Sequence, residues 1–172
     1  MIHDIDIILS LVKAEVKNIE ASGVAVVSDT IDIANARIQF NNGAVANVTA
    51  SRISQKKMRK MRIFQRDAYI SLDFITGTSE VYHLLPIDQN ADQAMMSLGE
   101  IGIGEKRKRL IYEHPEIKEI NALKYELELF IKSILYKTNP VVSGIDGLRA
   151  LKVAEIIMKK IEKSQEIFTE SQ

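Results

Sequence analysis

Two side chains near the start of the sequence, a histidine and an aspartate, could carry chemistry together. His3 and Asp6 lie three residues apart, so a helix would place them on one face. A histidine beside a carboxylate can relay a proton near neutral pH, because the ordinary pKa of imidazole is about 6.5. The alternative is a solvated first turn, in which the positive end of the helix dipole favours Asp4 and Asp6. One histidine and two carboxylates within four residues cannot all face one ion, so the cluster is a poor zinc site.

The second candidate is the basic stretch 56–66, together with Arg52. Alternation along an extended strand would bring six side chains of the stretch to one face, namely Lys56, Met58, Lys60, Arg62, Phe64 and Arg66. Such a face could grip phosphates or an acidic partner, or it could be a solvated face or an edge strand protected by charge. Arg52 closes the segment Thr49-Ala-Ser-Arg at a predicted strand end, where its guanidinium could reach a ligand or simply face solvent.

Other motifs of catalysis and cofactor binding are missing from the sequence. Gly99, Gly102 and Gly104 give G-x-x-G-x-G, which is the wrong order for a dinucleotide fingerprint and has no clear strand before it or helix after it. We therefore expect these to be loop glycines. The sequence also has no P-loop, no nucleophile elbow and no metal-ligand spacing.

Composition restricts the class of protein further. A length of 172 residues, with 46% apolar and 27% charged residues, is typical of one globular domain. Acidic and basic residues balance at 23 each, which argues against a nucleic-acid or anionic-membrane binder. Without cysteine the sequence can form no disulfide, thiolate metal site or cysteine nucleophile. Charges at the N-terminus and the lack of a long apolar run predict a cytoplasmic protein.

The elements that would position these side chains follow in the order helix, strands, helices. The first segment has helical apolar spacing but no N-cap residue, which indicates either missing upstream chain or a frayed terminus. Asn42-Gly43 is a strong hairpin signal. Extended segments are predicted at 16–27, 36–40, 45–53, 57–65, 69–74, 80–85 and 107–112. The range 86–105 is predicted as a long loop that could contain a short helix over 94–98.

Two predicted helices close the chain. The first has the apolar stripe Ile120, Leu123, Leu127, Ile131 and Ile134, and Asn139-Pro140 ends it. The second begins at a capping-box sequence, Ser143 to Asp146, and has the stripe Leu148, Leu151, Ala154, Ile157, Met158 and Ile161. We expect 120–161 and the inward strand residues to form one continuous core. The order predicts a single α+β domain over 1–172, with an open, mainly antiparallel sheet that helices cover on one face.

Two parts of the sequence resemble one protein family. His3-Asp-Ile-Asp6, at the head of an apolar helix, is similar to the H-x-x-D signature of the glucose–fructose oxidoreductase, inositol dehydrogenase and MocA (Gfo/Idh/MocA) family. The segments Ala122–Ile131 and Asn139–Leu151 resemble its C-terminal signature, in which an E-L-x-x-F-I helix, a proline loop and S-G-x-D-G-L-x-A-L follow one another. The resemblance covers the whole chain and implies an open sheet with helices on one face, of the glyceraldehyde-3-phosphate dehydrogenase-like type.

The resemblance also implies roles for individual residues. In the family an N-terminal Rossmann domain holds NAD or NADP and supplies a catalytic lysine, so this chain would bind no cofactor itself. His3 matches the catalytic histidine, and Asp6 matches the aspartate that contacts substrate hydroxyls. The family's catalytic aspartate, four residues before the histidine, would precede Met1. The resemblance therefore implies a substrate-binding and oligomerisation domain that is inactive alone.

The resemblance implies two kinds of partner, namely a sugar or nucleotide sugar and further copies of the chain. The sequence most resembles bacterial family members placed near lipopolysaccharide or nucleotide-sugar genes, some of which are similar to UDP-N-acetylglucosamine 3-dehydrogenases. Arg52 and the basic stretch would suit a pyrophosphate-bearing substrate or a subunit interface. Strands carrying Val48, Met58, Phe64 and Leu72 have apolar residues on both faces, which predicts a homodimer or homotetramer through the open sheet face. The alternative function is a non-catalytic assembly module, and nucleic-acid binding ranks below both.

Overall fold

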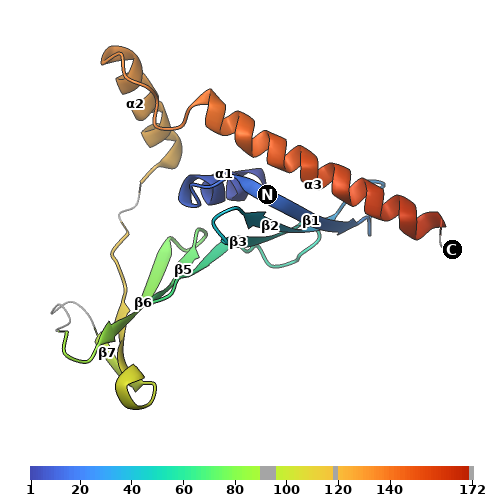
Figure 1. Cartoon of the computed structure of the whole chain (residues 1–172). Helices are drawn as coiled ribbons and strands as arrows, with labels where there is room; N and C mark the ends of the chain where they lie inside the picture. The colour runs from blue at the N-terminus through green and yellow to red at the C-terminus, as the bar shows by residue number, and fades with distance from the viewer. Residues whose placement is uncertain (90–95, 118–119, 171–172) are drawn as a thin grey trace. The chain divides into compact units, whose positions relative to one another are not determined.

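The computed structural model describes residues 1–89, 96–117 and 120–170, and the chain divides into two compact units. The three-stranded unit comprises Met1–Gln55 and Glu126–Gln172, and the five-stranded unit comprises Lys56–Tyr125. Figure 1 follows the chain through both. Among the described residues, no helix has the length and apolar character that crossing a membrane requires.

In the three-stranded unit, two helices cover one face of an antiparallel sheet (Figure 1). The sheet has the order β1 (Val16–Val24), β2 (Ile33–Phe40) and β3 (Val45–Ser51), and the helices are α1 (Ile2–Leu11) and α3 (Gly144–Glu170). The predicted Asn42-Gly43 turn joins β2 to β3. Gly43 has a φ of 85°, a left-handed conformation that most side chains would strain.

Alternation gives this sheet one apolar and one polar face. In β2, Ala36, Ile38 and Phe40 are buried, while Asn35 before them and Arg37 between Ala36 and Ile38 are exposed. The apolar face packs against α1 and α3, and each fully buried large side chain contributes roughly 1.5–3 kcal/mol relative to exposure. The core comprises Ile5, Leu9, Ile19, Ala36, Ile38, Phe40, Val48, Ala150, Val153, Ile157 and Ile161.

The C-terminal helix begins where its sequence predicts. The Ser143 hydroxyl donates to Asp146 Oδ2 at 2.6 Å, and the Ser143 N–H donates to the same oxygen at 2.8 Å. These bonds lower the pKa of the Asp146 carboxyl, the hydroxyl bond most strongly. The capping box is therefore confirmed.

The predicted apolar stripe of α3 is only partly correct. Ile157 and Ile161 are buried as expected, together with Ala150 and Val153. Three members of the predicted stripe are exposed instead, namely Leu148, Leu151 and Met158. The helix is apolar on more than one side, so periodicity alone could not select the buried side. The buried side of α3 packs closely against β1 at Gly23, where an added Cβ would lie 2.8 Å from Ile161 Cγ2.

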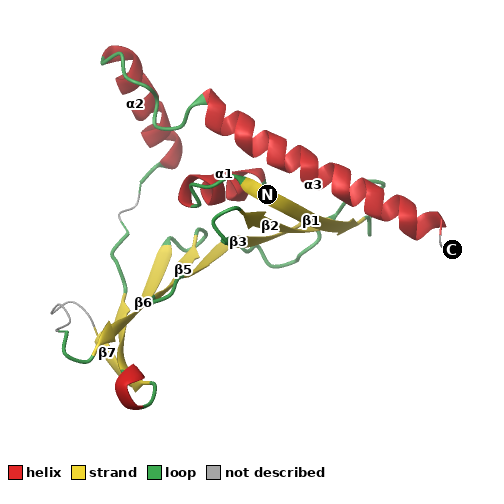
Figure 2. Ribbon diagram, in the orientation of Figure 1, coloured by secondary structure: helices red, strands yellow, loops and turns green. Residues whose placement is uncertain are grey.

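The five-stranded unit is built on one antiparallel sheet with the order β4-β5-β6-β8-β7. Figure 2 shows its strands in yellow, with β5, β6 and β7 labelled. Its strands are β4 (Lys60–Phe64), β5 (Ala68–Asp73), β6 (Thr78–Pro86), β7 (Met96–Ile101) and β8 (Lys108–Glu113). A short 3₁₀ helix, η1 (Gly104–Lys106), connects β7 to β8. The strands predicted from this part of the sequence are confirmed, with changes of a few residues at their ends.

One predicted element in this unit is wrong. The range 86–105 was expected to be a loop with room for a short helix over 94–98, but Met96–Ile101 forms strand β7. Residues 94 and 95 lie outside the described residues. The strand pairs with β8 and has an irregularity between Ser97 and Gly99. Its weak local pattern is compensated by its pairing with β8, the next strand along the chain after η1.

Helix α2 (Ala122–Leu135) is confirmed as a helix, but its apolar stripe does not extend the core. Side chains of Leu123, Leu127, Ile131 and Ile134 are between half and two-thirds exposed. The expectation of a continuous core over 120–161 is therefore wrong, since the core takes only α3 from that range. The α+β class with antiparallel strands is confirmed, although the strands form two sheets rather than one.

Candidate functional site

Helix α1 carries the predicted histidine and aspartate, and its opposite side is packed in the core. Ile5 and Leu9 are buried in the core of the three-stranded unit, which fixes the helix against the sheet. His3 is exposed and Asp6 is half-buried, and they lie on neighbouring turns at i and i+3. Among the described residues, no hydrogen bond or ion pair occupies either side chain. Both polar groups are therefore free to bind a ligand.

The first turn of α1 has its own carboxylate. Asp4 Oδ2 lies 3.3 Å from the amino group of Met1, and no side chain caps the helix. The solvated-turn interpretation of the sequence therefore applies to Asp4. It does not account for Asp6, which is two residues further from the helix start and has no such contact among the described residues.

Arg52 lies directly after β3, as predicted, and two side chains from the loop before β2 hold it. Its backbone N–H donates to the Asp32 carbonyl at 2.9 Å, and its Nη1 donates to Thr30 Oγ1 at 3.1 Å. Its Nε lies 3.6 Å from Asp32 Oδ1. The Arg52 side chain is still 60% exposed, so part of the guanidinium remains available to a ligand.

Asp32 is the anchor of this arrangement. Its buried carboxylate accepts backbone N–H bonds from Val26, Val27 and Ser28 at 2.8–3.1 Å, and the Ser28 hydroxyl donates to its other oxygen. These bonds, led by that from Val27, lower the pKa of Asp32 to about 2. Sequence reasoning missed Asp32, although the run Ser28-Asp-Thr-Ile-Asp32 is typical of side chains that bond to nearby backbone.

The basic stretch divides into a strand and two flanks. In β4, Lys60, Arg62 and Phe64 point to one exposed side of the sheet, as the alternation predicts. Residues 56 and 58 precede the strand and residue 66 follows it. Lys60 pairs with Asp73 of β5 at 3.1 Å. The Ile75 N–H and the Lys60 ammonium lower the pKa of the Asp73 carboxyl. Lys60 is thus part of the sheet's own structure, while Arg62 has no ion-pair partner among the described residues.

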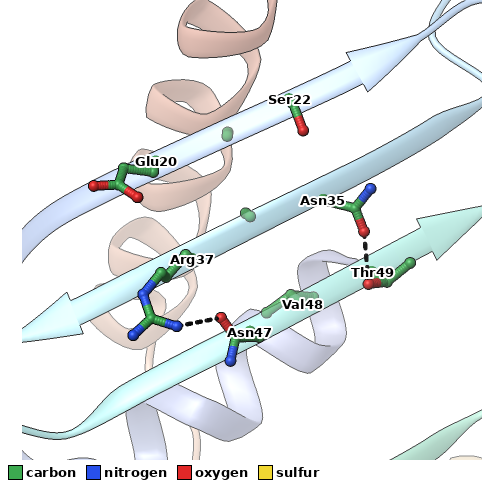
Figure 3. A pocket seen from close by; sticks show the side chains of 9 residues that line it. Glu20, Ser22, Asn35, Arg37, Asn47, Val48 and Thr49 are labelled. Carbon is green, nitrogen blue, oxygen red and sulfur yellow. Dashed lines mark hydrogen bonds between the residues drawn. The ribbon is translucent and has the colours of Figure 1, made fainter.

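The polar face of the three-stranded sheet has a hollow that sequence reasoning missed. Figure 3 shows it from the side opposite the helices. The hollow has a volume of about 390 Å³, and its polar lining comprises Glu20, Ser22, Asn35, Arg37, Asn47 and Thr49. Arg37 Nη1 donates to Asn47 Oδ1 at 3.1 Å, and Thr49 Oγ1 donates to Asn35 Oδ1 at 2.8 Å. Four of the polar side chains that line the hollow are therefore already hydrogen-bonded to one another.

The three predicted site residues therefore lie in one unit. His3 and Asp6 share α1, while Arg52 is held by Asp32 and Thr30 at the end of β3. No hydrogen bond between described residues joins Arg52 to the α1 pair. Within the described residues, no group of histidines and carboxylates could hold a metal ion.

Comparison with known proteins gives a consistent assignment. Residues 1–71 match the GFO/IDH/MocA C-terminal domain. A UDP-N-acetylglucosamine 3-dehydrogenase from Acidithiobacillus ferrooxidans is 34% identical over 163 residues, which are 94% of this chain and 47% of that protein. A solved structure of the same enzyme superposes with a TM-score of 0.78 at 32% identity, over 95% of this chain and 46% of that one. The family match covers residues 1–71, and the similarity to the Acidithiobacillus ferrooxidans enzyme extends over nearly the whole chain.

A more distant structure has the same fold. A levoglucosan dehydrogenase, solved with NADH and levoglucosan, superposes with a TM-score of 0.69 at 19% identity, over 95% of this chain and 47% of that one. At this identity the likeness concerns the fold alone. The chain spans about half the length of the relatives it matches, since it covers 46–47% of those described here.

Proposed function

We propose that this chain is the substrate-binding half of an NAD(P)-dependent dehydrogenase that oxidises a secondary hydroxyl of a sugar or nucleotide sugar. The observation that carries the proposal is the pair His3 and Asp6, which face outward from a helix anchored by buried Ile5 and Leu9. The 34% identity to a UDP-N-acetylglucosamine 3-dehydrogenase supports a nucleotide sugar as the substrate.

The nicotinamide cofactor would be held by a part of the protein outside this chain. A pyrophosphate site needs a glycine-rich turn that opens a long helix. Gly99, Gly102 and Gly104 have positive φ angles, but they lie in β7, in the loop after it and in the three-residue η1. The described residues of this chain therefore do not fit a dinucleotide. When bound elsewhere, the cofactor would accept the hydride.

The roles left to this chain concern protons and hydroxyl groups. His3 would take part in removing the proton of the reacting hydroxyl, because imidazole exchanges protons near neutral pH. Asp6 would accept hydrogen bonds from neighbouring sugar hydroxyls and orient the ring. Arg52, steadied by Thr30 and Asp32, would bind an anionic group such as a diphosphate.

A second role, assembly, is supported by a separate observation. Phe64 on β4 is 76% exposed, and Met58 before it is 72% exposed. Large apolar side chains exposed on and next to an edge strand are typical of a partner surface. We propose that the sheet of the five-stranded unit forms a homodimer or homotetramer. This role would also suit a non-catalytic assembly module.

Kinetics of the full-length protein with UDP-N-acetylglucosamine and NAD or NADP test the catalytic proposal. Asp6→Ala should raise KM with a smaller effect on kcat, because it removes binding that ground state and transition state share. Arg52→Ala should raise KM for the nucleotide sugar but not for the free sugar. A KM that is unchanged in both variants would contradict the substrate-binding role.

Calorimetry with the isolated chain tests the division of labour. The chain should bind neither NAD nor NADP with micromolar affinity, because its glycines do not form the phosphate-binding turn. Micromolar binding of either dinucleotide would contradict the proposal that the cofactor site lies outside this chain.

A further inference from the structure

Helix α2 leaves its apolar side largely uncovered. Residues 126–135 of this helix belong to the three-stranded unit. Within this range only Leu129 and Ser133 are half-buried or buried. Large apolar side chains are more than half exposed at five positions, namely Leu127, Phe130, Ile131, Ile134 and Leu135. The spacing of the first four places them on one side of the helix, and the described residues of the unit do not cover that side.

A helix as short as α2 depends on packing for its stability. It has 14 residues, and isolated helices below about 12–15 residues are marginal in water. The Asn121 side chain caps its start by accepting the Lys124 N–H at 3.0 Å, but a cap satisfies only one of the unpaired donors of a helix start. A stable α2 therefore requires an apolar partner beyond the described residues of its unit.

The segment that follows α2 adds to this exposed surface. Val141 and Val142 before α3, and Ile145 and Leu148 in its first turns, are 49–76% exposed. Together with the five side chains of α2 they form the α2–α3 surface. Charges in the range 126–151 balance, since Glu126, Glu128 and Asp146 are matched by Lys132, Lys137 and Arg149. The α2–α3 surface is therefore suited to another protein surface rather than to a polyanion.

The occupant of the α2–α3 surface follows from the length of the relatives. The chain covers 46–47% of them, so more than half of each relative lies outside the part that matches. The proposed function assigns cofactor binding to the corresponding part of this protein. Hydride transfer requires that part to pack against the unit that carries His3 and Asp6. Interfaces between domains of one polypeptide typically bury about 600–1,500 Å², and the exposed apolar side chains of this unit are concentrated in the α2–α3 surface.

We propose that the α2–α3 surface is the docking site of the cofactor-holding half of the same polypeptide, and that this contact keeps α2 helical. The inference rests on the proposed function, which assigns the cofactor to a part outside this chain, and it names the surface that joins the two halves. Burial of the apolar side chains on docking supplies the packing that α2 otherwise lacks. Because α3 and α1 share one core, docking there also positions the cofactor-holding half relative to His3 and Asp6.

Hydrogen exchange measured by mass spectrometry compares α2 in the full-length protein and in the 172-residue chain. In the full-length protein, the amides of residues 126–135 should be protected at least about 100-fold, because opening α2 would expose its docked side. In the isolated chain at about 1 µM they should be protected less than about 10-fold, as for a marginal helix. Strand β2, which lies in the core, is the internal reference and should be protected equally in both.

Neighbouring substitutions on α2 provide a matched pair. Ile131 and Lys132 are both exposed, and successive residues point about 100° apart around a helix. Ile131→Ser in the full-length protein should lower the protection of α2 on the order of 10- to 100-fold, because it removes a docked isoleucine. Lys132→Ser should lower it less than about 3-fold, since serine carries the same helix propensity at both positions. Ile131→Leu, which stays apolar, should retain the protection. Equal losses for the two serine variants would contradict docking through the apolar side.

The remaining outcomes separate this inference from the proposed function. Protection of α2 in the isolated chain at about 1 µM would mean that the rest of this chain covers it. Protection that appears only when the isolated chain is raised to about 100 µM, where weak specific interfaces form, would assign the surface to a second copy instead. Either result would contradict the proposed occupant. A full-length protein that binds NAD or NADP in calorimetry but leaves α2 unprotected would contradict the docking site alone. A full-length protein that binds neither dinucleotide would contradict the proposed function.

Discussion

The two units of this chain use antiparallel sheets in different ways. In the three-stranded unit, helices α1 and α3 cover the apolar face of the sheet, and polar residues line the other face. In the five-stranded unit, both faces of the sheet carry apolar side chains, and Phe64 on its edge strand β4 is 76% exposed. The sheet of the first unit thus has its large apolar side chains covered by helices of the same unit, whereas the sheet of the second leaves large apolar side chains exposed.

The largest contrast should follow from removing one phenylalanine in each unit. Phe40→Ala should lower the free energy of unfolding by about 3–5 kcal/mol, because the side chain is fully buried and its loss leaves a cavity. Phe64→Ala should lower it by no more than about 1.5 kcal/mol, the usual contribution of an aromatic pair, because the exposed ring loses only its stacking on Tyr69. Urea unfolding measures both values. Equal losses in the two variants would abolish the contrast between a closed and an open sheet.

A smaller effect is expected at the contact between α3 and β1. A Cβ at Gly23 would lie 2.8 Å from Ile161 Cγ2, 2.9 Å from Ile31 Cγ2 and 3.0 Å from the Ile33 carbonyl oxygen. Gly23→Ala should therefore destabilise the three-stranded unit by about 1–3 kcal/mol through overpacking.

The matched control for this variant lies on the exposed side of α3. A Cβ at Gly147 would meet nothing within 4 Å, so Gly147→Ala should stabilise the helix by about 0.5–1 kcal/mol. Thermal melting compares the two variants. A stabilising Gly23→Ala would mean that α3 does not pack this closely on the sheet.

The smallest contrast concerns the pH dependence of two anchored loops. The pKa of Asp32 is lowered to about 2 by its backbone bonds, from an ordinary value of 3.8. A lowered native pKa means that the carboxylate stabilises the fold above about pH 4 and loses this contribution as pH falls towards 2. Asp32→Asn should therefore reduce the melting temperature at pH 7 and flatten its decline below pH 4.

Asp73 offers the comparison in the five-stranded unit. The Ile75 N–H and the Lys60 ammonium also lower the pKa of the Asp73 carboxyl, and its side chain is 17% exposed, while that of Asp32 is fully covered. Asp73→Asn should show the same direction with a smaller change in melting temperature. A larger effect at Asp73 than at Asp32 would contradict the expectation that the more fully buried carboxylate contributes more to stability.

Sequence reasoning succeeded where local patterns carried the information. Alternation in β2, the Asn42-Gly43 turn and the Ser143 to Asp146 capping box each depend on neighbours in the chain, and all are confirmed. It failed where the pairing or packing of one element against another decides the structure. Strand β7 is defined by its pairing with β8, and the buried side of α3 by its fit to β1.

In the candidate site, too, the local features could be predicted from the sequence and the contacts between elements could not. Arg52 was expected at a strand end because the local pattern ends there, but its partners Thr30 and Asp32 come from another loop. His3 and Asp6 could be placed on one helical face from their spacing. That Ile5 and Leu9 anchor this helix in the core required the structure.

The most direct test of the central claim is the rate of NADH production by the full-length protein with His3 replaced. If His3 exchanges the proton of the reacting hydroxyl, His3→Ala should lower kcat by roughly 10²–10⁴-fold, the usual contribution of a positioned acid or base. Its melting temperature should stay within a few degrees of wild type, because His3 is exposed and has no partner among the described residues. A variant that turns over UDP-N-acetylglucosamine at the wild-type rate would contradict the catalytic role of His3.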